Sequence, residues 1–261
     1  MTLDAAGPRS PAILDLVALP SQAPDAPGSQ PPLLEVGQNP VTQQLFETAL
    51  GYAPSHFGGS PRAPVESVSF HEAAHFCNMA SRGLGLAPGF RLGGEGRDIR
   101  VTGVDLDAVA VGAVRLLTAE EWEWACLAGN DGEYWWGSSQ SSLDTHAWWR
   151  GNSSDAPVAI GALGHTNAWG LSDMIGNVWE WCMPSQVGDT GIPEVNHPWK
   201  GGSWHTSNPS DMVSSFDIGS SPEVRTPGLG FRIARSYLKA DVLDQSSRRR
   251  PAAASQVNND R

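Results

Sequence analysis

Three residues in the stretch FHEAAHFCN have types and a spacing that could bind zinc. His71, Glu72 and His75 form the pattern H-E-x-x-H, which on a helix places two imidazoles on one face with a carboxylate beside them. Metalloproteases use such a pair of ligands with the glutamate as general base. The extended pattern also needs glycine and histidine where this chain has Asn78 and Ser81.

The helix that must carry these residues predicts another role for Glu72. Ser69 is a natural N-cap, and Glu72 follows three residues later, which together make a capping box for a helix over residues 69–83, ended by Gly83. We therefore interpret H-E-x-x-H as part of an ordinary helix. Weak transition-metal binding by His71 and His75, one turn apart, is the alternative.

Two further helices follow from the same signals. Residues 41–50 have an apolar stripe with Thr42 as the expected cap, and residues 118–128 begin with a second capping box, Thr118 and Glu121. The rest of the chain reads as short strands and long loops rich in glycine and tryptophan. The predicted fold class is α+β with much irregular structure.

Composition and charge limit the function. The chain has 261 residues, of which 40% are hydrophobic and 17% charged, and a net charge of −11. Such an acidic chain is a poor match for nucleic acid or an anionic membrane. The basic run at residues 248–250 lies in a polar tail, where a solvated segment is the expected state.

Cysteine usage and the N-terminus favour a reduced, cytoplasmic setting. Cys77, Cys126 and Cys182 are odd in number and widely spaced, so they indicate neither a disulfide framework nor a zinc ribbon. The N-terminus is a poor signal peptide, and no apolar run is long enough for a membrane span. Five further histidines lie singly in expected loops, where solvation or hydrogen bonding is their usual state: His56, His146, His165, His197 and His205.

Five blocks of the sequence, in order, resemble the formylglycine-generating enzymes and sulfatase-modifying-factor domains. They are PVESVSFHEAAHFCNMAS (64–81), RLLTAEEWEWACLAG (115–129), WGLSDMIGNVWEW (169–181), KGGSW (200–204) and GLGFRIAR (228–235). The resemblance implies a C-type-lectin-like fold with little regular structure and a core rich in tryptophan. We expect a Pro-rich segment over 1–34, the domain over 35–238 and a disordered polar tail over 239–261.

The resemblance also implies where chemistry would occur. The copper-dependent oxidases of the family carry two cysteines after the GGS block, and the matching positions here are Thr206 and Asp211. A Cu(I) site needs thiolates, so no copper and no cysteine oxidation are expected. Related iron enzymes use an H-x-x-x-H-x-E pattern, but Cys77 stands where the glutamate would be, and too little chain precedes the blocks for their extra domain.

A third group of relatives displays a variable ligand-binding surface between the GGSW and GFR blocks, as in retroelement-diversified proteins. The matching segment, residues 205–229, is rich in small polar residues, which suits adaptable recognition, although an ordinary polar loop is equally consistent with it. The predicted ligand-binding residues are Trp204, His205, Thr206, Ser207, Asn208, Ser210, Asp211, Ser214, Phe216 and Asp217.

A structural calcium site is implied at the GNVWEW loop. By resemblance, the ligands would be the carbonyls of Ile175, Gly176 and Val178 with the Glu180 carboxylate, and oxygen ligands suit Ca²⁺. The alternative is that Glu180 pairs with a buried arginine, such as Arg232, or with a tryptophan N–H.

These observations lead to a non-catalytic protein that binds a ligand or a protein partner through the surface between the GGSW and GFR blocks. The expected partner is an unknown protein or a small polar ligand, rather than nucleic acid or a membrane. The main alternative is a formylglycine-generating-type oxidoreductase or another metal-dependent enzyme of altered mechanism, using His205, Asp211 or His75. A purely structural accessory domain is a further alternative.

Overall fold

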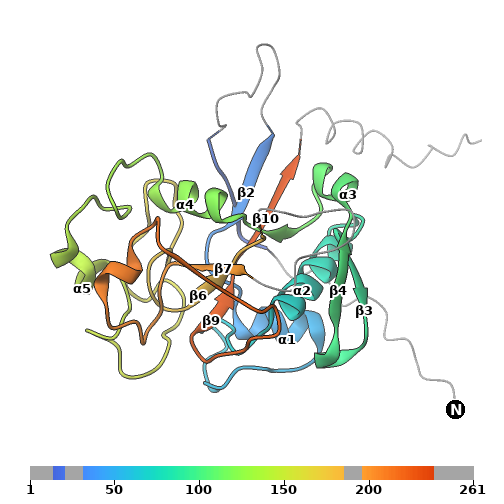
Figure 1. Cartoon of the computed structure of the whole chain (residues 1–261), viewed down its shortest axis with the longest axis horizontal. Helices are drawn as coiled ribbons and strands as arrows, with labels where there is room; N and C mark the ends of the chain where they lie inside the picture. Colours follow the sequence, from blue (N-terminus) through green and yellow to red (C-terminus); the bar gives the residue numbers. More distant parts are fainter. Residues whose placement is uncertain (1–13, 21–31, 185–195, 238–261) are drawn as a thin grey trace, which may run out of the picture.

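The computed structural model describes residues 14–20, 32–184 and 196–237, which form short helices and strands joined by long connections (Figure 1). The α-helices are α1 (Gln43–Leu50), α2 (Phe70–Gly83), α3 (Leu106–Ala110), α4 (Ala119–Leu127) and α5 (Leu143–His146). The 3-10 helices are η1 (Gly96–Asp98), η2 (Gln140–Ser142) and η3 (Pro209–Met212). The strands are β1 (Leu16–Ala18), β2 (Leu33–Gly37), β3 (Phe90–Gly93), β4 (Arg100–Val104), β5 (Arg115–Leu116), β6 (Trp179–Trp181), β7 (His197–Lys200), β8 (Asp217–Ser220), β9 (Leu229–Phe231) and β10 (Ile233–Tyr237).

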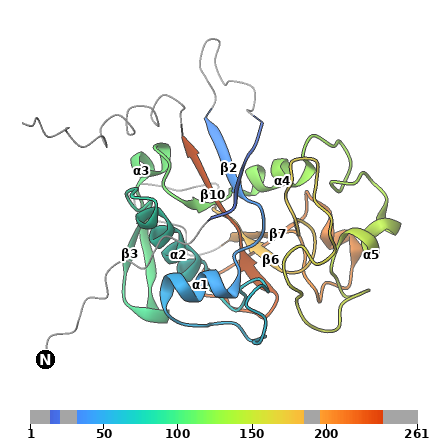
Figure 2. The same cartoon turned by 180° about the vertical axis from the view of Figure 1, so that it is seen from behind.

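The strands make three small sheets. The first has the order β1-β2-β10-β5 and is antiparallel, with Ala234 of β10 opposite Val36 of β2. The second is the antiparallel pair β3–β4. The third has the order β8-β7-β6-β9, in which β6 and β9 run parallel. The two views place α5 at one end of the molecule and β3 at the other (Figures 1 and 2).

The predicted helices are confirmed, with their caps. Thr42 Oγ1 accepts from Leu45 N in α1, and both capping boxes are complete, at Ser69–Glu72 of α2 and Thr118–Glu121 of α4. The helix α2 ends at Gly83, as predicted, but Gly83 does not act as the left-handed cap. Gly83 is the last helical residue, Leu84 follows in the right-handed conformation, and the left-handed residue is Gly85.

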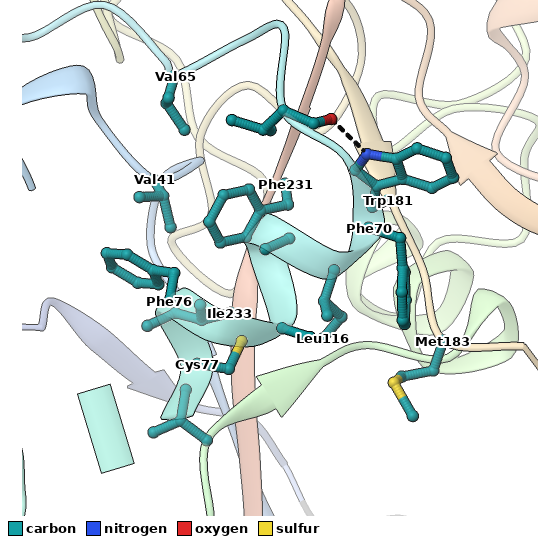
Figure 3. Packing of buried hydrophobic residues seen from close by; sticks show 14 of the residues in the cluster. Val41, Val65, Phe70, Phe76, Cys77, Leu116, Trp181, Met183, Phe231 and Ile233 are labelled. Atoms are coloured by element: carbon teal, nitrogen blue, oxygen red, sulfur yellow. Dashed lines mark hydrogen bonds between the residues drawn. The ribbon is translucent and has the colours of Figure 1, made fainter. Parts of the chain in front are cut away.

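The first core joins α2 to all three sheets. Phe70 and Phe76 of α2 pack with Trp181 of β6 and Phe231 of β9, as Figure 3 shows for the residues it labels. The Trp181 indole N–H donates to the Val68 carbonyl at 2.9 Å, so the polar edge of this buried ring is satisfied. A second core, around Trp122 of α4, supports the loops between α4 and β6.

The expected domain boundary at residue 35 falls inside a strand. β1 and the first residues of β2 lie before it and pair with each other in the first sheet. The short strand Leu16–Ala18 has no distinctive pattern beside the Pro-rich run, so the sequence alone does not predict it. The predicted tail at 239–261 lies outside the described residues, as does most of the Pro-rich run. No helix among the described residues has the length and apolar composition needed to cross a bilayer.

Candidate functional site

Glu72 of the H-E-x-x-H pattern has a structural role. Its fully buried carboxylate accepts from Ser69 N (2.9 Å), Tyr52 Oη (2.9 Å), Arg97 Nε (3.0 Å) and Arg225 Nε (2.7 Å). Burial acts to raise the pKa of Glu72, but the hydrogen bonds from Ser69 and Arg225 outweigh it and lower that pKa. The predicted capping role is therefore confirmed, and the same carboxylate ties the end of the 205–229 segment to α2.

The two histidines of the pattern face different surroundings. His71 Nδ1 accepts from the Val101 N–H at 3.1 Å, and His71 Nε2 lies 3.4 Å from Glu223 Oε1. His75 Nδ1 is buried without a hydrogen-bond partner among the described residues. Within the described ranges no cluster of three or more metal-ligating side chains is present.

The predicted ligand-binding segment begins at a turn that requires glycine. Gly201 has φ +96°, and a Cβ there would lie 2.7 Å from the Met174 carbonyl oxygen. Beyond this turn, exposed and buried residues alternate. His205, Ser207, Asn208, Ser210 and Asp217 are exposed. Trp204, Asp211 and Phe216 are half-buried.

Two predicted ligand-binding residues are buried and face inward. Thr206 Oγ1 accepts from the Ser203 N–H at 2.9 Å, and Ser214, whose own N–H donates to the Glu133 carbonyl at 2.8 Å, is almost wholly enclosed. Assigning Thr206 and Ser214 to the surface was therefore wrong. Small hydroxyl side chains occur both on recognition surfaces and inside tight turns, so composition could not separate the two roles.

A row of four aromatic rings lies beside the predicted ligand-binding segment. Two of the four, His56 and Phe57, are not among the ligand-binding residues predicted from the sequence. Phe57 meets Trp204 edge to face, with ring centroids 5.3 Å apart. His56 packs on Phe57 at 4.9 Å and His205 on Trp204 at 4.8 Å, so the row runs His56–Phe57–Trp204–His205. Its two ends are exposed and its middle is half-buried.

Phe57 is held in place by its backbone. Glu66 Oε1 accepts from the Phe57 N–H at 2.8 Å, and Gln43 Nε2 donates to the Phe57 carbonyl at 2.7 Å. On the other side, the Trp204 indole N–H donates to the Pro227 carbonyl at 3.0 Å. No signal in the sequence links positions 57 and 204, because the contact depends wholly on the tertiary fold.

A third segment, residues 150–155, completes the surface. Arg150 N donates to the Thr206 carbonyl, and Ser153 Oγ donates to the Trp204 carbonyl at 2.7 Å. The Arg150 side chain pairs with Asp155 at 2.6 Å. Partial burial of the His205 ring against its neighbours, helped by the Arg150 charge, lowers the pKa of His205 and so favours the neutral imidazole at pH 7.

The residues at the copper positions cannot supply thiolates. Thr206 is engaged with Ser203 as described, and Asp211 Oδ1 accepts from Asn208 Nδ2 at 2.8 Å. All three cysteines are buried, and burial raises the pKa of each thiol. None of them lies in the 205–229 segment, so this segment offers no thiolate ligand, and its one sulfur atom is the thioether of the buried Met212.

One pair at the site has the geometry of a nucleophile and its base. Ser203 Oγ lies 3.0 Å from His205 Nδ1, within the range of a serine–histidine dyad. Ser203 is fully buried, however, and its hydroxyl also contacts Thr206 Oγ1 at 3.3 Å. A substrate carbonyl cannot reach this hydroxyl, so the pair serves to hold the turn.

Glu180 does not fit the implied calcium site. Its buried carboxylate is paired with the Arg232 guanidinium, which donates to Glu180 Oε1 at 2.9 Å, and it accepts from Trp122 Nε1 at 2.7 Å. A cation competing for these oxygens would face a fixed positive charge. The contacts match the alternative reading, a buried pair with arginine and an indole N–H. The carbonyls of Ile175, Gly176 and Val178 lie in the loop leading to this pair.

Calcium is accordingly expected to have no effect on stability. Thermal unfolding in calcium chloride and in a calcium chelator should give the same Tm, because a ligand stabilises only the state that binds it. A Tm that rises with calcium, together with one bound calcium by elemental analysis, would instead support the site implied by the resemblance.

Comparison with known proteins decides the family. Residues 33–237 match the sequence profile of the sulfatase-modifying factor enzyme 1-like domain. The chain belongs to this family. The resemblance read from the five blocks is thus confirmed, and with it the α+β, C-type-lectin-like fold of short strands and few helices.

Relatives within the family carry different names. The chain is 29% identical to the chaperone protein LppX of Paenibacillus barcinonensis over 77% of this chain and 79% of that protein. It is 29% identical to the formylglycine-generating enzyme of Mycobacterium tuberculosis (45% of this chain, 50% of that one) and 30% identical to the bovine inactive C-alpha-formylglycine-generating enzyme 2 (46% and 43%). It spans half or less of these last two.

Solved structures agree on the fold. Treponema denticola variable protein 1 superposes with a TM-score of 0.68 and 26% identity, covering 84% of this chain and 94% of that one. PvdO from Pseudomonas aeruginosa superposes with a TM-score of 0.59 and 19% identity over 86% and 92%, which speaks for the fold alone. The domain therefore occurs in proteins named as enzymes, as an inactive enzyme, as a chaperone and as a variable protein, so function must be argued from the site.

Proposed function

We propose that this protein is a non-catalytic binding protein of the sulfatase-modifying factor family, related in role to the diversified variable proteins. The observation that carries the proposal is the chemistry of positions 206 and 211. A buried threonine and an aspartate bonded to Asn208 stand where the copper oxidases of the family need thiolates.

The surface has the make-up of a recognition site. Phe57 and Trp204 are fixed aromatic side chains with few rotatable bonds, and they supply contact area at a low entropic cost. Ser207, Asn208 and Ser210 stand beside them as small, exposed hydrogen-bonding groups. The ligand is a protein or a small polar molecule that contacts both parts.

The names of two relatives are consistent with this role. The Treponema protein is named as variable, and the bovine relative is named as inactive. In this chain, variation between copies of the gene would be tolerated at Ser207, Asn208 and Ser210, whereas Thr206, Met212 and Ser214 are buried and would stay constant.

The experiment has a catalytic arm and a binding arm. In the first, copper-loaded protein is incubated with a cysteine peptide of the sulfatase type, with the Mycobacterium tuberculosis relative as positive reference. We expect no aldehyde by mass spectrometry and no stoichiometric copper, iron or zinc. Aldehyde formation, or one bound transition metal, would favour the enzyme instead.

In the binding arm, a phage-displayed library of random peptides is selected on the full chain. Peptides recovered on the wild type should lose at least about tenfold in affinity on Ser207→Arg/Ser210→Arg, because two bulky charges would cover the polar patch. Thr102→Arg, an exposed change on β4 at the far end of the molecule, is the matched control and should bind normally. Equal binding by both variants would rule out this surface as the site.

A further inference from the structure

A second surface stands out at the end of the molecule that holds α5. Seven half-exposed or exposed rings gather there, and we call them the indole belt: Trp124, Trp135, Trp136, Trp149, Trp169, His146 and His165. The five tryptophans all pack against the second core. Large aromatic rings gathered at a surface in this way mark interaction sites more often than chance exposure does.

Six of the rings form two groups in which neighbouring rings contact one another. Trp136 stacks on His146 with centroids 4.9 Å apart, Trp135 meets His146 edge to face at 5.0 Å, and His146 lies 5.3 Å from His165. Trp169 packs on Trp124 of α4 with centroids 4.5 Å apart, and these two rings form the second group.

Asn167 fixes the second group. Its side-chain amide donates to the Ala125 carbonyl at 2.7 Å and to the Cys126 carbonyl at 3.1 Å, and its Oδ1 accepts from the Trp169 N–H at 3.0 Å. These bonds attach the 165–169 loop to α4. The belt is therefore a preformed surface.

Three of the indole N–H groups are available to a partner. The N–H groups of Trp136 and Trp149 donate to the Ser139 carbonyl and to Asp144 Oδ1. Those of Trp124, Trp135 and Trp169 make no hydrogen bond within the described residues, and none of the three belongs to the buried unpaired atoms. Each is thus a half-exposed ring with an open donor.

The charged residues around the indole belt are mostly acidic. Arg150 is the single lysine or arginine in residues 117–170, and Asp155 already pairs with it. Glu121 and Glu123 also have cationic partners, Arg115 and Lys200. The remaining carboxylates are exposed and have no ion-pair partner among the described residues: Glu120, Asp131, Glu133 and Asp144.

We infer that the indole belt docks an arginine-rich segment of a partner protein. A guanidinium group can stack on an indole face and pair with a neighbouring carboxylate at the same time, and this surface offers both. The indole belt lies next to the proposed ligand-binding surface of residues 205–217, which we call the 205–217 surface, because the Ser214 N–H donates to the Glu133 carbonyl. The two surfaces use different side chains. The inference therefore does not depend on the proposed function.

The test is a titration of the full chain with an oligo-arginine peptide, followed by tryptophan fluorescence and calorimetry. Trp135→Leu or Trp169→Leu keeps an apolar side chain against the core but removes the ring, and should weaken binding about fivefold to tenfold. Asp131→Asn/Glu133→Gln should weaken it about tenfold and reduce its salt dependence. Circular dichroism checks that each variant is folded.

Matched controls separate docking from general attraction to an acidic protein. Glu95→Gln/Asp107→Asn removes the same charge from exposed positions near η1 and α3, at the opposite end of the molecule (Figures 1 and 2), and should change affinity less than about twofold. Ser207→Arg/Ser210→Arg should leave peptide binding within about threefold, which distinguishes the belt from the 205–217 surface.

Three results would overturn the inference. One is equal weakening by the two charge pairs, which would mean non-specific attraction. Another is unchanged binding by both leucine variants, which would remove the rings from the site. The third is salt-independent binding of a neutral oligosaccharide probe at the belt in place of the peptide, which would assign this surface to sugars.

Discussion

Glu180→Ala is expected to destabilise the protein by about 3–5 kcal/mol, enough to remove most of the stability of a typical domain. Arg232 and Glu180 are both almost fully buried, and they bridge β9–β10 to β6. Removing the carboxylate leaves the guanidinium charge without its counter-ion and the Trp122 N–H without an acceptor. Urea unfolding followed by fluorescence measures the loss.

Arg232 also makes hydrogen bonds outside its pair with Glu180, so the loss of stability should exceed that of an ordinary ion pair. Its Nη1 donates to the carbonyls of Gly37 and Gln38 at 2.7 Å each, and its Nη2 donates to the Ser172 carbonyl at 2.7 Å. An unpaired Arg232 would therefore disturb the connection after β2 as well. The matched control is Asp155→Asn, which breaks the exposed Arg150 pair at a residue with φ +56° that asparagine tolerates, and should cost about 1 kcal/mol or less. Equal losses in the two variants would contradict this account.

Acidification below pH 6.5 is expected to destabilise the fold, by about 3 kcal/mol from His197 alone. His197 on β7 is fully buried on the Phe70 ring, and neither of its ring nitrogens has a partner among the described residues. Burial, reinforced by nearby His71, lowers the pKa of His197 from 6.5 to about 4, whereas Glu223 acts weakly in the opposite direction.

The sign follows from which state takes up the proton. Above pH 6.5 the imidazole is neutral in both states and stability does not change. Between pH 6.5 and about 4 the unfolded chain is protonated and the folded one is not, so the free energy of unfolding falls as the pH falls. Burial also lowers the pKa of His71 and His75, which adds to the loss in the same direction.

His197→Phe isolates this contribution. It keeps a ring on Phe70 and removes the titrating group, so the fall in stability between pH 7 and pH 4.5 should shrink by about 2–3 kcal/mol. Thr102→Ser, a change at an exposed position without a titrating group, is the control and should leave the wild-type slope. A His197→Phe protein with the wild-type pH slope would show that another group governs acid unfolding.

The structural features that depend on residues close together in the sequence are the ones that the sequence predicted best. Ser69 with Glu72 and Thr118 with Glu121 are three residues apart, so their capping boxes could be read from the chain and are present. The parallel pairing of β6 with β9 could not be predicted in this way, because Trp179 and Leu229 are brought together only by the complete fold. β1 was missed for the related reason that three residues carry too little pattern.

The same distinction between local signals and long-range contacts applies to the residues of the candidate site. The exposed loop around Ser207 was predicted from composition and block order. Phe57 and Arg150 were not, since their place beside Trp204 and Thr206 depends on long-range contacts. The role of Glu180 was left between a calcium ligand and an ion-pair partner, and only the three-dimensional position of Arg232 favours the second.

The burial of every cysteine has a practical consequence for studying this molecule. Cys77, Cys126 and Cys182 are enclosed and hold their protons, so in the folded state they are poor targets for maleimides and other alkylating reagents. A new cysteine placed at an exposed position, such as Ser207, would be the dominant site of labelling. Dyes or spin probes can therefore be attached beside the aromatic row without first replacing the three native cysteines.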